Sequence, residues 1–371
     1  MPNTSGRPPF RADHIGSLLR PPVLRQAFRD HAARKISDAE FERILDDSIR
    51  VAVRMQEDAG LAVVTDGEFR RASYWSRFVE RVGGFVIKPA EFRFRNDDGH
   101  ELEFTGTYAI GRLRRDKPLA LDEFVFLKGE TKATPKITLP APSTMHFYRC
   151  GDFADRHIYA EPEAFFDDLG EVFAQEIAEL AAAGCRYVQL DEVAIAMLCD
   201  PAIRRTVEQA GLVPDRLIGL YIAAINRAVA GAPKQVAIGV HVCRGNFKGH
   251  YLSAGGYDVI AERFFADTNV NHFLLEFDTP RAGDFSPLRF LPKDKGVVLG
   301  LVSSKTPQLE SFAALRQRIE DAARIVDLDQ LAISPQCGFA STVAGNPLTA
   351  ADEDAKLRLV VEVAREVWGG D

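Results

Sequence analysis

Histidine, cysteine and carboxylate side chains in the C-terminal half of the chain have the types and spacing of a metal site. His241 and Cys243 are two residues apart in an apolar run that is typical of a β-strand, where side chains at i and i+2 point the same way. Glu276 and Asp278 end the next such run, and Cys337 follows a later one. Imidazole, thiolate and carboxylate together suit Zn²⁺. We therefore expect a zinc site that His241, Cys243, Cys337 and one of the two carboxylates form.

The ligand set also indicates what such a zinc ion would do. Two thiolates make zinc electron-rich, which favours binding a soft thiol over making hydroxide, so a zinc hydrolase is not expected. A thiol bound to zinc is deprotonated near neutral pH. A His-x-Cys pair alone is weak evidence for a metal, and Cys337 alone could be a small buried apolar side chain. The prediction therefore depends on whether the strand ends converge.

The elements that must position these residues are short apolar runs alternating with longer helical patterns, as in a parallel sheet of βα units. Eight runs are predicted as strands: 11–18, 62–66, 136–140, 187–191, 235–243, 272–278, 296–303 and 331–336. Six patterns are predicted as helices: 38–59, 162–184, 214–230, 254–267, 307–326 and 349–368. Ser37, Thr306 and Thr349 are predicted helix N-caps, and Glu40 would complete a capping box with Ser37.

Eight strands with intervening helices predict an α/β fold, a (β/α)8 TIM barrel forming one domain over residues 1–371. In that fold the catalytic residues gather at the C-terminal ends of the strands. The sequence meets this expectation, because side chains capable of chemistry follow nearly every predicted strand, among them His14, Asp66, Asp191, His241 and Ser303.

Residues 82–130 interrupt the alternation of strands and helices. Parts of this stretch alternate polar and apolar residues with a period of two, as at 91–95 and 101–104, and Asn-Asp-Asp-Gly at 96–99 is a turn signal. We expect an antiparallel hairpin excursion within the second βα connection. A flexible surface loop is the alternative, but so many phenylalanines would be poorly placed in one.

Composition excludes several classes of protein. The chain has 371 residues, 46% of them apolar, and a net charge of −7 without a basic stripe, so we expect no nucleic-acid partner. The N-terminus has no apolar core of a signal peptide, and no apolar run approaches 18 residues, so we expect no membrane span. Five cysteines, an odd number spread thinly, favour a reduced cytoplasmic protein.

Six motifs, in this order, carry a family resemblance over nearly the whole chain. The chain resembles the catalytic C-terminal barrel of cobalamin-independent methionine synthase, and more closely the short, single-barrel relatives of that enzyme. The motifs are HIGSLLR at 14–20, VTDGEFRR at 64–71, QLDEVAI at 189–195, HVCRGN at 241–246, LLEFD at 274–278 and SPQCGF at 334–339.

The resemblance implies an activity and a role for each site residue. It implies zinc-dependent methyl transfer to the thiol of homocysteine, giving methionine. The implied zinc ligands are His241, Cys243, Glu276 and Cys337, so the resemblance selects Glu276 over its neighbour. The implied homocysteine site is the turn of Ile15, Gly16 and Ser17, with Glu68 and Asp191 on the amino group. Two carboxylates suit an ammonium group.

Two departures from the family concern the methyl donor. The long family enzyme has a further N-terminal barrel that helps to hold its polyglutamylated folate donor, and it has a histidine after strand seven that is thought to assist proton transfer. Lys305 aligns with that histidine, and residues 138–144 differ from the Thr-Gly-Pro stretch on the folate side. Lys305 could donate a proton only with a depressed pKa; otherwise it is a surface lysine before the helix cap.

Alternatives therefore stay open at this point. The donor could be a folate, a corrinoid or a small methylated compound, or the electrophile could be an epoxide. Glu68 and Asp191 favour an amino-acid thiol over a sulfonate thiol, whereas Arg70 and Arg71 could bind an anionic tail or cap a loop. A non-catalytic barrel with a structural zinc is the alternative of another class. The oligomeric state stays open, with a homodimer among the possibilities.

Overall fold

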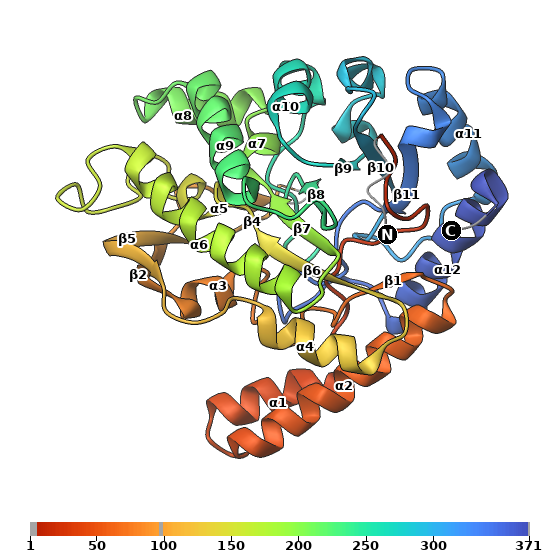
Figure 1. The fold of residues 1–371 in the computed structure, drawn as a ribbon, viewed down its shortest axis with the longest axis horizontal. Helices are drawn as coiled ribbons and strands as arrows, with labels where there is room; N and C mark the ends of the chain where they lie inside the picture. Colours follow the sequence, from red (N-terminus) through yellow and green to blue (C-terminus); the bar gives the residue numbers. More distant parts are fainter. Residues whose placement is uncertain (1–5, 96–98, 370–371) are drawn as a thin grey trace.

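A curled sheet of seven parallel strands forms the centre of the structure, a computed structural model that describes residues 6–95 and 99–369. The strands lie in the order β1-β6-β7-β8-β9-β10-β11, and helices surround the sheet (Figure 1). The strands are β1 (Val63–Val64), β6 (Thr134–Pro140), β7 (Tyr187–Glu192), β8 (Ala237–Val242), β9 (His272–Glu276), β10 (Gly296–Val302) and β11 (Leu331–Pro335).

Helices follow the strands along the chain and bury apolar side chains. They are α2 (Asp38–Asp58), α4 (Leu121–Glu130), α6 (Pro162–Ala182), α9 (Pro214–Val229), α10 (Ala261–Asp267), α11 (Phe312–Ala323) and α12 (Ala350–Trp368). The predicted helices 38–59, 162–184, 214–230 and 349–368 are confirmed to within two residues. None of the helices in the described part of the chain is long and apolar enough to cross a membrane.

The predicted first strand over 11–18 is wrong in extent. Within this range only Ala12 pairs with a strand, in a single bridge to Ile333 of β11. In this bridge the Asp13 N–H donates to the Ile333 carbonyl, and the Ile333 N–H donates to the Arg11 carbonyl. Gly16 has a φ of 128°, a conformation that L side chains rarely adopt, and it turns the chain out of the sheet. The predicted strand 62–66 is likewise reduced to the two residues of β1.

Two predicted helices begin later than expected. The pattern 254–267 forms only the 3₁₀ turn η1 (Tyr257–Val259) and α10, because Gly255 has a φ of 132°. The pattern 307–326 is helical only from Phe312, and its N-cap is Ser311 rather than Thr306. The side chain of Glu310 accepts hydrogen bonds from the Ser303 N–H and from Lys356 Nζ. These bonds hold the residues before Phe312 in a non-helical conformation. Further 3₁₀ turns are η2 (Pro280–Ala282), η3 (Ser286–Phe290) and η4 (Leu328–Gln330).

Helix α2 and helix α12 begin where the N-cap residues predict. Ser37 Oγ accepts the Glu40 N–H at 3.2 Å. Thr349 forms a full capping box with Asp352, each side chain accepting the other residue's N–H. These caps satisfy backbone donors that a helix leaves without partners in its first turn.

The predicted excursion is an antiparallel hairpin, but it is shorter than 82–130. Strand β2 (Val82–Pro89) pairs with β5 (Thr105–Arg115), and between them β3 (Phe94–Arg95) pairs with β4 (Glu101–Leu102). Residues 121–130 form α4 instead, because Phe124 and Leu127 bury themselves on one helical face against the sheet. Most of the turn predicted at 96–99 lies outside the described residues.

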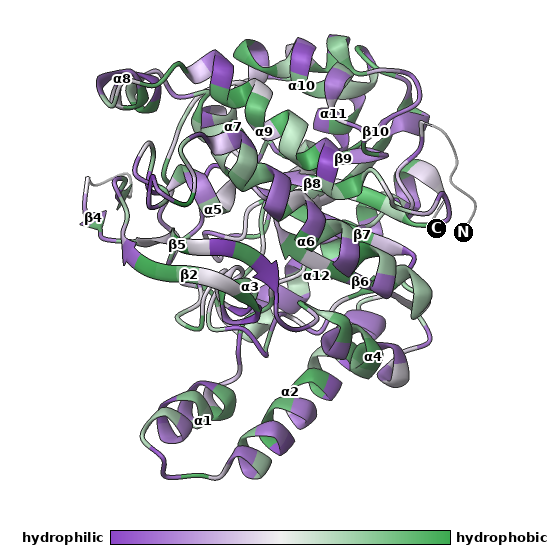
Figure 2. Ribbon diagram, turned by 60° about the vertical axis from the view of Figure 1, so that its left-hand side comes forward, coloured by the Kyte–Doolittle hydropathy of each residue, from purple (hydrophilic) through white to green (hydrophobic). Residues whose placement is uncertain are grey.

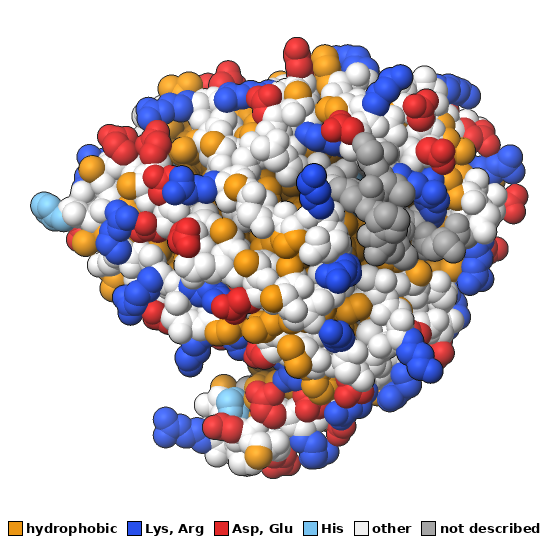
Figure 3. Space-filling model, in the orientation of Figure 1, with side chains coloured by type: hydrophobic (Ala, Val, Ile, Leu, Met, Phe, Trp, Pro, Cys, Tyr) orange, Lys and Arg blue, Asp and Glu red, His pale blue; other side chains and the backbone are white. Residues whose placement is uncertain are grey.

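The first two helices form an arm. Helix α1 (Pro22–Ala32) and the N-terminal part of α2 project from the body (Figure 2), and a hollow lies beside them on the surface (Figure 3). The C-terminal part of α2 packs against α4, α12 and β1. Positive and negative side chains are interspersed over the face that Figure 3 shows. Besides α1 and α4, the part of the chain that the structure describes has four short helices that the sequence left unpredicted: α3 (Ser76–Arg81), α5 (Thr144–Phe147), α7 (Ala194–Met197) and α8 (Pro201–Gln209).

Candidate metal centre and substrate pocket

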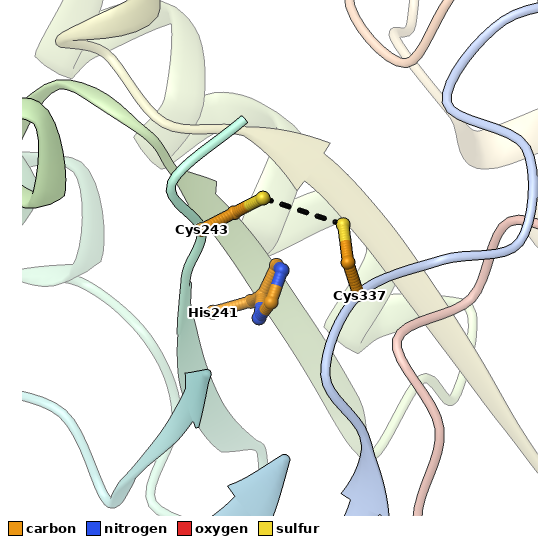
Figure 4. A group of neighbouring side chains, drawn as sticks. All are labelled: His241, Cys243 and Cys337. Atoms are coloured by element: carbon orange, nitrogen blue, oxygen red, sulfur yellow. Dashed lines mark hydrogen bonds between the residues drawn. The ribbon is translucent and has the colours of Figure 1, made fainter. Parts of the chain in front are cut away.

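Three of the four predicted metal ligands meet at the carboxyl ends of the strands. His241 lies in β8, Cys243 directly follows β8, and Cys337 lies two residues beyond β11 (Figure 4). One ligand atom from each lies within 4.8 Å of the others, and the two sulfurs are 3.3 Å apart. All three side chains are buried. Sequence spacing predicted this convergence, and the geometry agrees with it.

The sheet fixes the directions of these side chains. His241 is in register with Asp191 of β7 on one side and with Leu274 of β9 on the other. The Cys243 N–H still donates to the Glu192 carbonyl, so the strand geometry continues to the second ligand and both side chains point to the same face. The Gln336 N–H donates to the Val302 carbonyl and thereby anchors the segment that carries Cys337.

The hydrogen bonds of the three side chains leave them ready to bind a metal. His241 Nδ1 contacts the Leu274 carbonyl at 3.2 Å, which favours a proton on Nδ1 and a free lone pair on Nε2. Nε2 is buried and has no hydrogen-bond partner among the described residues. The hydrogen bond from Cys243 holds the pKa of Cys337 well below its usual range and raises that of Cys243. An imidazole and two thiols so arranged fit a zinc ion.

Glu276, the fourth predicted ligand, lies beside the three but outside their cluster. Its Oε2 accepts the Arg244 N–H at 3.0 Å, and its Oε1 lies 3.6 Å from Lys305 Nζ without a hydrogen-bond partner. Burial opposes ionisation, but the positive charges of Lys305 and Arg244 prevail and lower the pKa of Glu276. The site therefore holds an ionised carboxylate next to the sulfur pair.

Lys305 is a buried side chain, so its interpretation as a surface lysine is wrong. It is 8% exposed, and the loop after β10 turns it toward Glu276. Burial alone would lower its pKa, but the carboxylates of Glu276 and Asp278 outweigh burial and raise it. A lysine donates a proton readily near neutral pH only when its pKa is depressed. This environment favours a fixed positive charge over a proton donor.

A pocket next to the metal ligands brings together most of the predicted substrate residues. It is lined by the three ligands and by Ile15, Ser17, Glu68 and Asp191. Gly16 lies behind this surface, where a Cβ atom would come within 2.7 Å of the Thr138 methyl group. Glu276 and Lys305 do not line the pocket.

Glu68 is held in place from several directions. Its backbone is in the left-handed region with a φ of 60°, and its N–H donates to Asp66 Oδ1 at 2.8 Å. Thr138 Oγ1 donates to Glu68 Oε1 at 2.7 Å, while Oε2 is buried without a hydrogen-bond partner among the described residues. A non-glycine residue in this conformation is strained, and such strain is typical of functional sites.

Asp191 is positioned by a polar network inside the sheet. Gln189 Nε2 donates to Asp191 Oδ1 and to the Ile15 carbonyl, both at 2.7 Å. Gln189 Oε1 in turn accepts from the buried Lys136, which pairs with Asp13 at 2.8 Å. Burial first, and then the charge of Glu68, raise the pKa of Asp191 to about 7. An ammonium group between these two carboxylates would relieve their repulsion.

Arg70 and Arg71 are both engaged within the protein. Arg70 pairs with Glu42 and Asp46 of α2. Arg71 is buried and donates to Glu123 at 2.7 Å and to the Thr138 carbonyl at 2.8 Å. Neither side chain lines the pocket, so the prediction of an anionic tail bound here finds no support in the geometry.

Sequence reasoning missed the aromatic residues of the pocket. Five of them line it beside the predicted groups: Tyr74, Phe94, Phe104, Tyr148 and Phe247. The only signal was the alternation of phenylalanine in the excursion, which predicted a strand pair without saying where the pair would lie.

Comparisons with known proteins agree with this arrangement. A family model described as the catalytic domain of cobalamin-independent synthase matches residues 10–366. YxjH of Bacillus subtilis, an uncharacterized protein, is 40% identical over 367 residues, which cover 97% of this chain and 95% of YxjH. The methionine synthase of Pyrococcus furiosus is 28% identical over 326 residues, which cover 88% of this chain and 85% of that protein.

A solved structure extends the agreement to the fold. The crystal structure of the putative vitamin-B12 independent methionine synthase from Listeria monocytogenes is similar with a TM-score of 0.75 and 31% identity, covering 97% of this chain and 98% of that one. The family model, the relatives and this structure together show that the chain belongs to the cobalamin-independent methionine synthase family and is a methyltransferase.

Proposed function

We propose that this methyltransferase transfers a methyl group to the thiol of homocysteine and releases methionine, with a zinc ion bound by His241, Cys243, Cys337 and Glu276. One observation carries the proposal: the His-Cys-Cys cluster and the carboxylates Glu68 and Asp191 line a single pocket. Homocysteine carries a thiol, which suits the His-Cys-Cys cluster, and an ammonium group, which suits the two carboxylates.

The protein's own residues would place homocysteine for the reaction. Glu68 Oε2 has no partner among the described residues, and with Asp191 it would hold the ammonium group. Ser17 and the turn of residues 15–17 would receive the carboxylate. Zinc, when bound, would make the substrate thiol a thiolate near neutral pH.

Glu276 and Lys305 have a linked role in this proposal. Glu276 would be the fourth ligand while the substrate is absent, since its free Oε1 adjoins the sulfur pair. Lys305, 3.6 Å away, would keep this carboxylate ionised and receive it when the substrate thiol takes its place. A structural zinc would keep Glu276 as a ligand even when homocysteine is present. Exchange of Glu276 for the substrate thiol therefore distinguishes a catalytic zinc from a structural one.

The fold supports a finer proposal as well. We propose that the sheet is the wall of a (β/α)8 barrel in a single domain, with the segment around Ala12 in place of the first strand. Ala12 pairs with β11 on one side, and on the other side Thr65 Oγ1 donates to the Gly16 carbonyl at 2.6 Å. Calorimetry should then record one cooperative unfolding transition; two separate transitions would contradict a single domain.

A donor screen tests the proposed function. Zinc-loaded protein is incubated with homocysteine and, in separate reactions, methylcobalamin, a methylated folate or small methylated sulfur compounds, and methionine is measured by mass spectrometry. We expect methionine to form with at least one donor and to vanish when a chelator removes the metal. Absence of methionine with every donor would contradict the proposal.

A further inference from the structure

Five aromatic residues line the pocket beside the predicted homocysteine groups. Phe104 is central: its ring centroid lies 5.0 Å from those of Phe94 and Tyr148, and 5.6 Å from that of Phe247. Phe94 and Phe247 are also 5.6 Å apart. The Tyr74 and Tyr148 hydroxyls are 3.3 Å apart, and burial raises the pKa of both, so both phenols stay neutral.

The carboxylates and basic side chains are unequally distributed between the pocket lining and its surroundings. Glu68 and Asp191 line the pocket, whereas no lysine or arginine does so within the described ranges 6–95 and 99–369. Arg71, which lies 3.6 Å from Glu68, is shared with Glu123. Lys248 is exposed at the rim with its ammonium 5.4 Å from the Phe247 ring centroid, so this ring already has a cation against one face.

The aromatic faces attract cations, and none of the described residues that line the pocket is a lysine or arginine that would repel one. The face of an aromatic ring carries negative potential and binds ammonium-type groups, most strongly where water is excluded. A donor with several carboxylates, such as a polyglutamylated folate, would meet repulsion here. With its open mouth included, the pocket has an empty volume of about 540 Å³, a size typical of small-molecule sites.

We propose that the methyl donor of this enzyme is a small methyl sulfonium cation, held by the aromatic rings around Phe104. The inference rests on the proposed function, because the acceptor is the thiolate of homocysteine. In the transfer, the thiolate sulfur forms a bond to the methyl carbon, and the methyl–sulfonium bond breaks with its electron pair left on the donor sulfur. The donor departs as a neutral thioether and the acceptor becomes a thioether, so no proton or redox partner is needed.

The pocket favours this step in two further ways. A sulfonium donor already carries the positive charge that a folate amine gains only by protonation, so transfer from it needs no acid. The neutral thioether product loses its attraction to the aromatic rings, so the product leaves more easily than the donor.

Binding of simple cations to the zinc-loaded enzyme tests the inference. Trimethylsulfonium and tetramethylammonium are titrated by calorimetry against tert-butanol, a neutral molecule of similar size. We expect both cations to bind at least about tenfold more tightly than tert-butanol. With homocysteine, trimethylsulfonium should yield methionine and dimethyl sulfide in equal amounts. Equal affinity for cation and alcohol would overturn the inference, and transfer from tetramethylammonium alone would overturn the choice of sulfonium.

Variants of the half-buried rings separate cation binding from simple apolar contact. Phe104→Leu and Phe247→Leu keep apolar volume but remove the aromatic face, so each should weaken cation binding by about 3- to 10-fold and leave tert-butanol affinity within twofold. Phe92→Leu is the matched control, because Phe92 lies in the same hairpin and stacks on Phe147 without lining the pocket. Unchanged cation affinity in both pocket variants would contradict the proposal.

The same experiment distinguishes a wrong donor from a wrong function. If the enzyme binds homocysteine and makes methionine from methylcobalamin or a methylated folate but does not bind trimethylsulfonium, the sulfonium inference is wrong and the proposed function stands. If the enzyme binds trimethylsulfonium but not homocysteine, the methionine-forming function is wrong, and the sulfonium inference, which requires that acceptor, falls with it.

Discussion

Cys243 and Cys337 are the residues on which the metal site depends most. Their sulfurs are 3.3 Å apart although they lie 94 positions apart in the chain, and no third cysteine among the described residues belongs to the cluster. Without a metal, a hydrogen bond joins the two sulfurs, which lowers the pKa of Cys337 and raises that of Cys243. Zinc would replace this hydrogen bond and bind both sulfurs as thiolates.

Removal of either thiol should remove the metal. We expect Cys243→Ser and Cys337→Ser each to lower zinc affinity by more than the roughly 10- to 100-fold that loss of an outer-shell partner costs. Elemental analysis of the purified proteins measures the effect. Cys150→Ser, a buried cysteine outside the cluster, should keep about one zinc per chain. Full zinc content in Cys243→Ser would exclude that residue from the site.

Glu68 should matter for homocysteine and not for zinc. Glu68→Gln keeps the acceptor for Thr138 but loses the charge that faces the ammonium group. A charged hydrogen bond contributes about 1.5–3 kcal/mol, so homocysteine should bind about 10- to 100-fold more weakly while zinc content is unchanged. Calorimetry measures the affinity, with the exposed Glu103→Gln as control. Equal affinity in wild type and Glu68→Gln would remove Glu68 from the substrate site.

The positions of site residues could be predicted from the sequence where they followed the two-residue period of a strand. His241 and Cys243 could be placed on one face from their spacing alone. Glu276 could not be separated from Asp278 by periodicity, because both face the same way, and the choice came from family resemblance. The aromatic residues of the pocket escaped prediction because their position depends on how the hairpin folds over the sheet, which no local pattern encodes.

At the scale of elements, helix α12 is joined to the substrate turn by a buried carboxyl. Glu353 Oε1 accepts the Leu19 N–H at 2.9 Å, two residues beyond Ser17. Burial raises the pKa of Glu353 to about 8, well above its usual value of 4.5. The folded protein therefore keeps a proton on Glu353 that the unfolded chain loses at lower pH.

This linkage predicts how stability changes with pH. Because the pKa is higher in the folded state, the contribution of Glu353 is fully present below about pH 4.5 and is lost as the pH rises toward 8. Glu353→Gln removes that loss, so its stability relative to wild type should increase from pH 5 to pH 8 by up to about 1.4 kcal/mol per pH unit. Denaturant titrations at several pH values measure it. Glu362 is exposed on the same helix, so Glu362→Gln should show no such trend. The linkage would be contradicted if the free energy of unfolding of Glu353→Gln changed with pH in parallel with that of the wild type.

Element prediction failed where side chains override local preference. The segment 307–311 has a helical pattern, but the bonds of Glu310 to Ser303 and Lys356 hold it out of α11. Helix α4 was hidden in an apparent hairpin because residues 124–127 form a short continuous apolar run, which is equally typical of a strand. The amphipathic helices α2, α6, α9 and α12 were predictable because a polar and an apolar face alternate with the helical period.

At the scale of the whole molecule, the site joins distant parts of the chain at one end of the sheet. Its walls come from the turn after Ala12, from β7 and β8, from the hairpin and from the loop after β11. The metal ligands span β8 and the β11 loop, which are separated in the sheet by β9 and β10. A bound ion would therefore act as a cross-link across the open end of the sheet.

Removal of zinc should destabilise the folded protein reversibly. A ligand present at 1,000 times its dissociation constant stabilises the fold by about 4 kcal/mol, so we expect the thermal midpoint to fall by several degrees in a chelator and to recover when zinc is returned. Calorimetry of the zinc-loaded and metal-free protein measures the shift. Cys337→Ser should show no response to zinc, and an unchanged midpoint in the wild type would contradict a site that spans the sheet.

X-ray absorption at the zinc edge tests the central claim most directly, because it counts the sulfur ligands before and after homocysteine is added. The account predicts two sulfurs with nitrogen and oxygen in the free enzyme, from Cys243, Cys337, His241 and Glu276. It predicts three sulfurs and loss of the oxygen when homocysteine binds. A sulfur count that stays at two in saturating homocysteine would contradict thiol activation at this site.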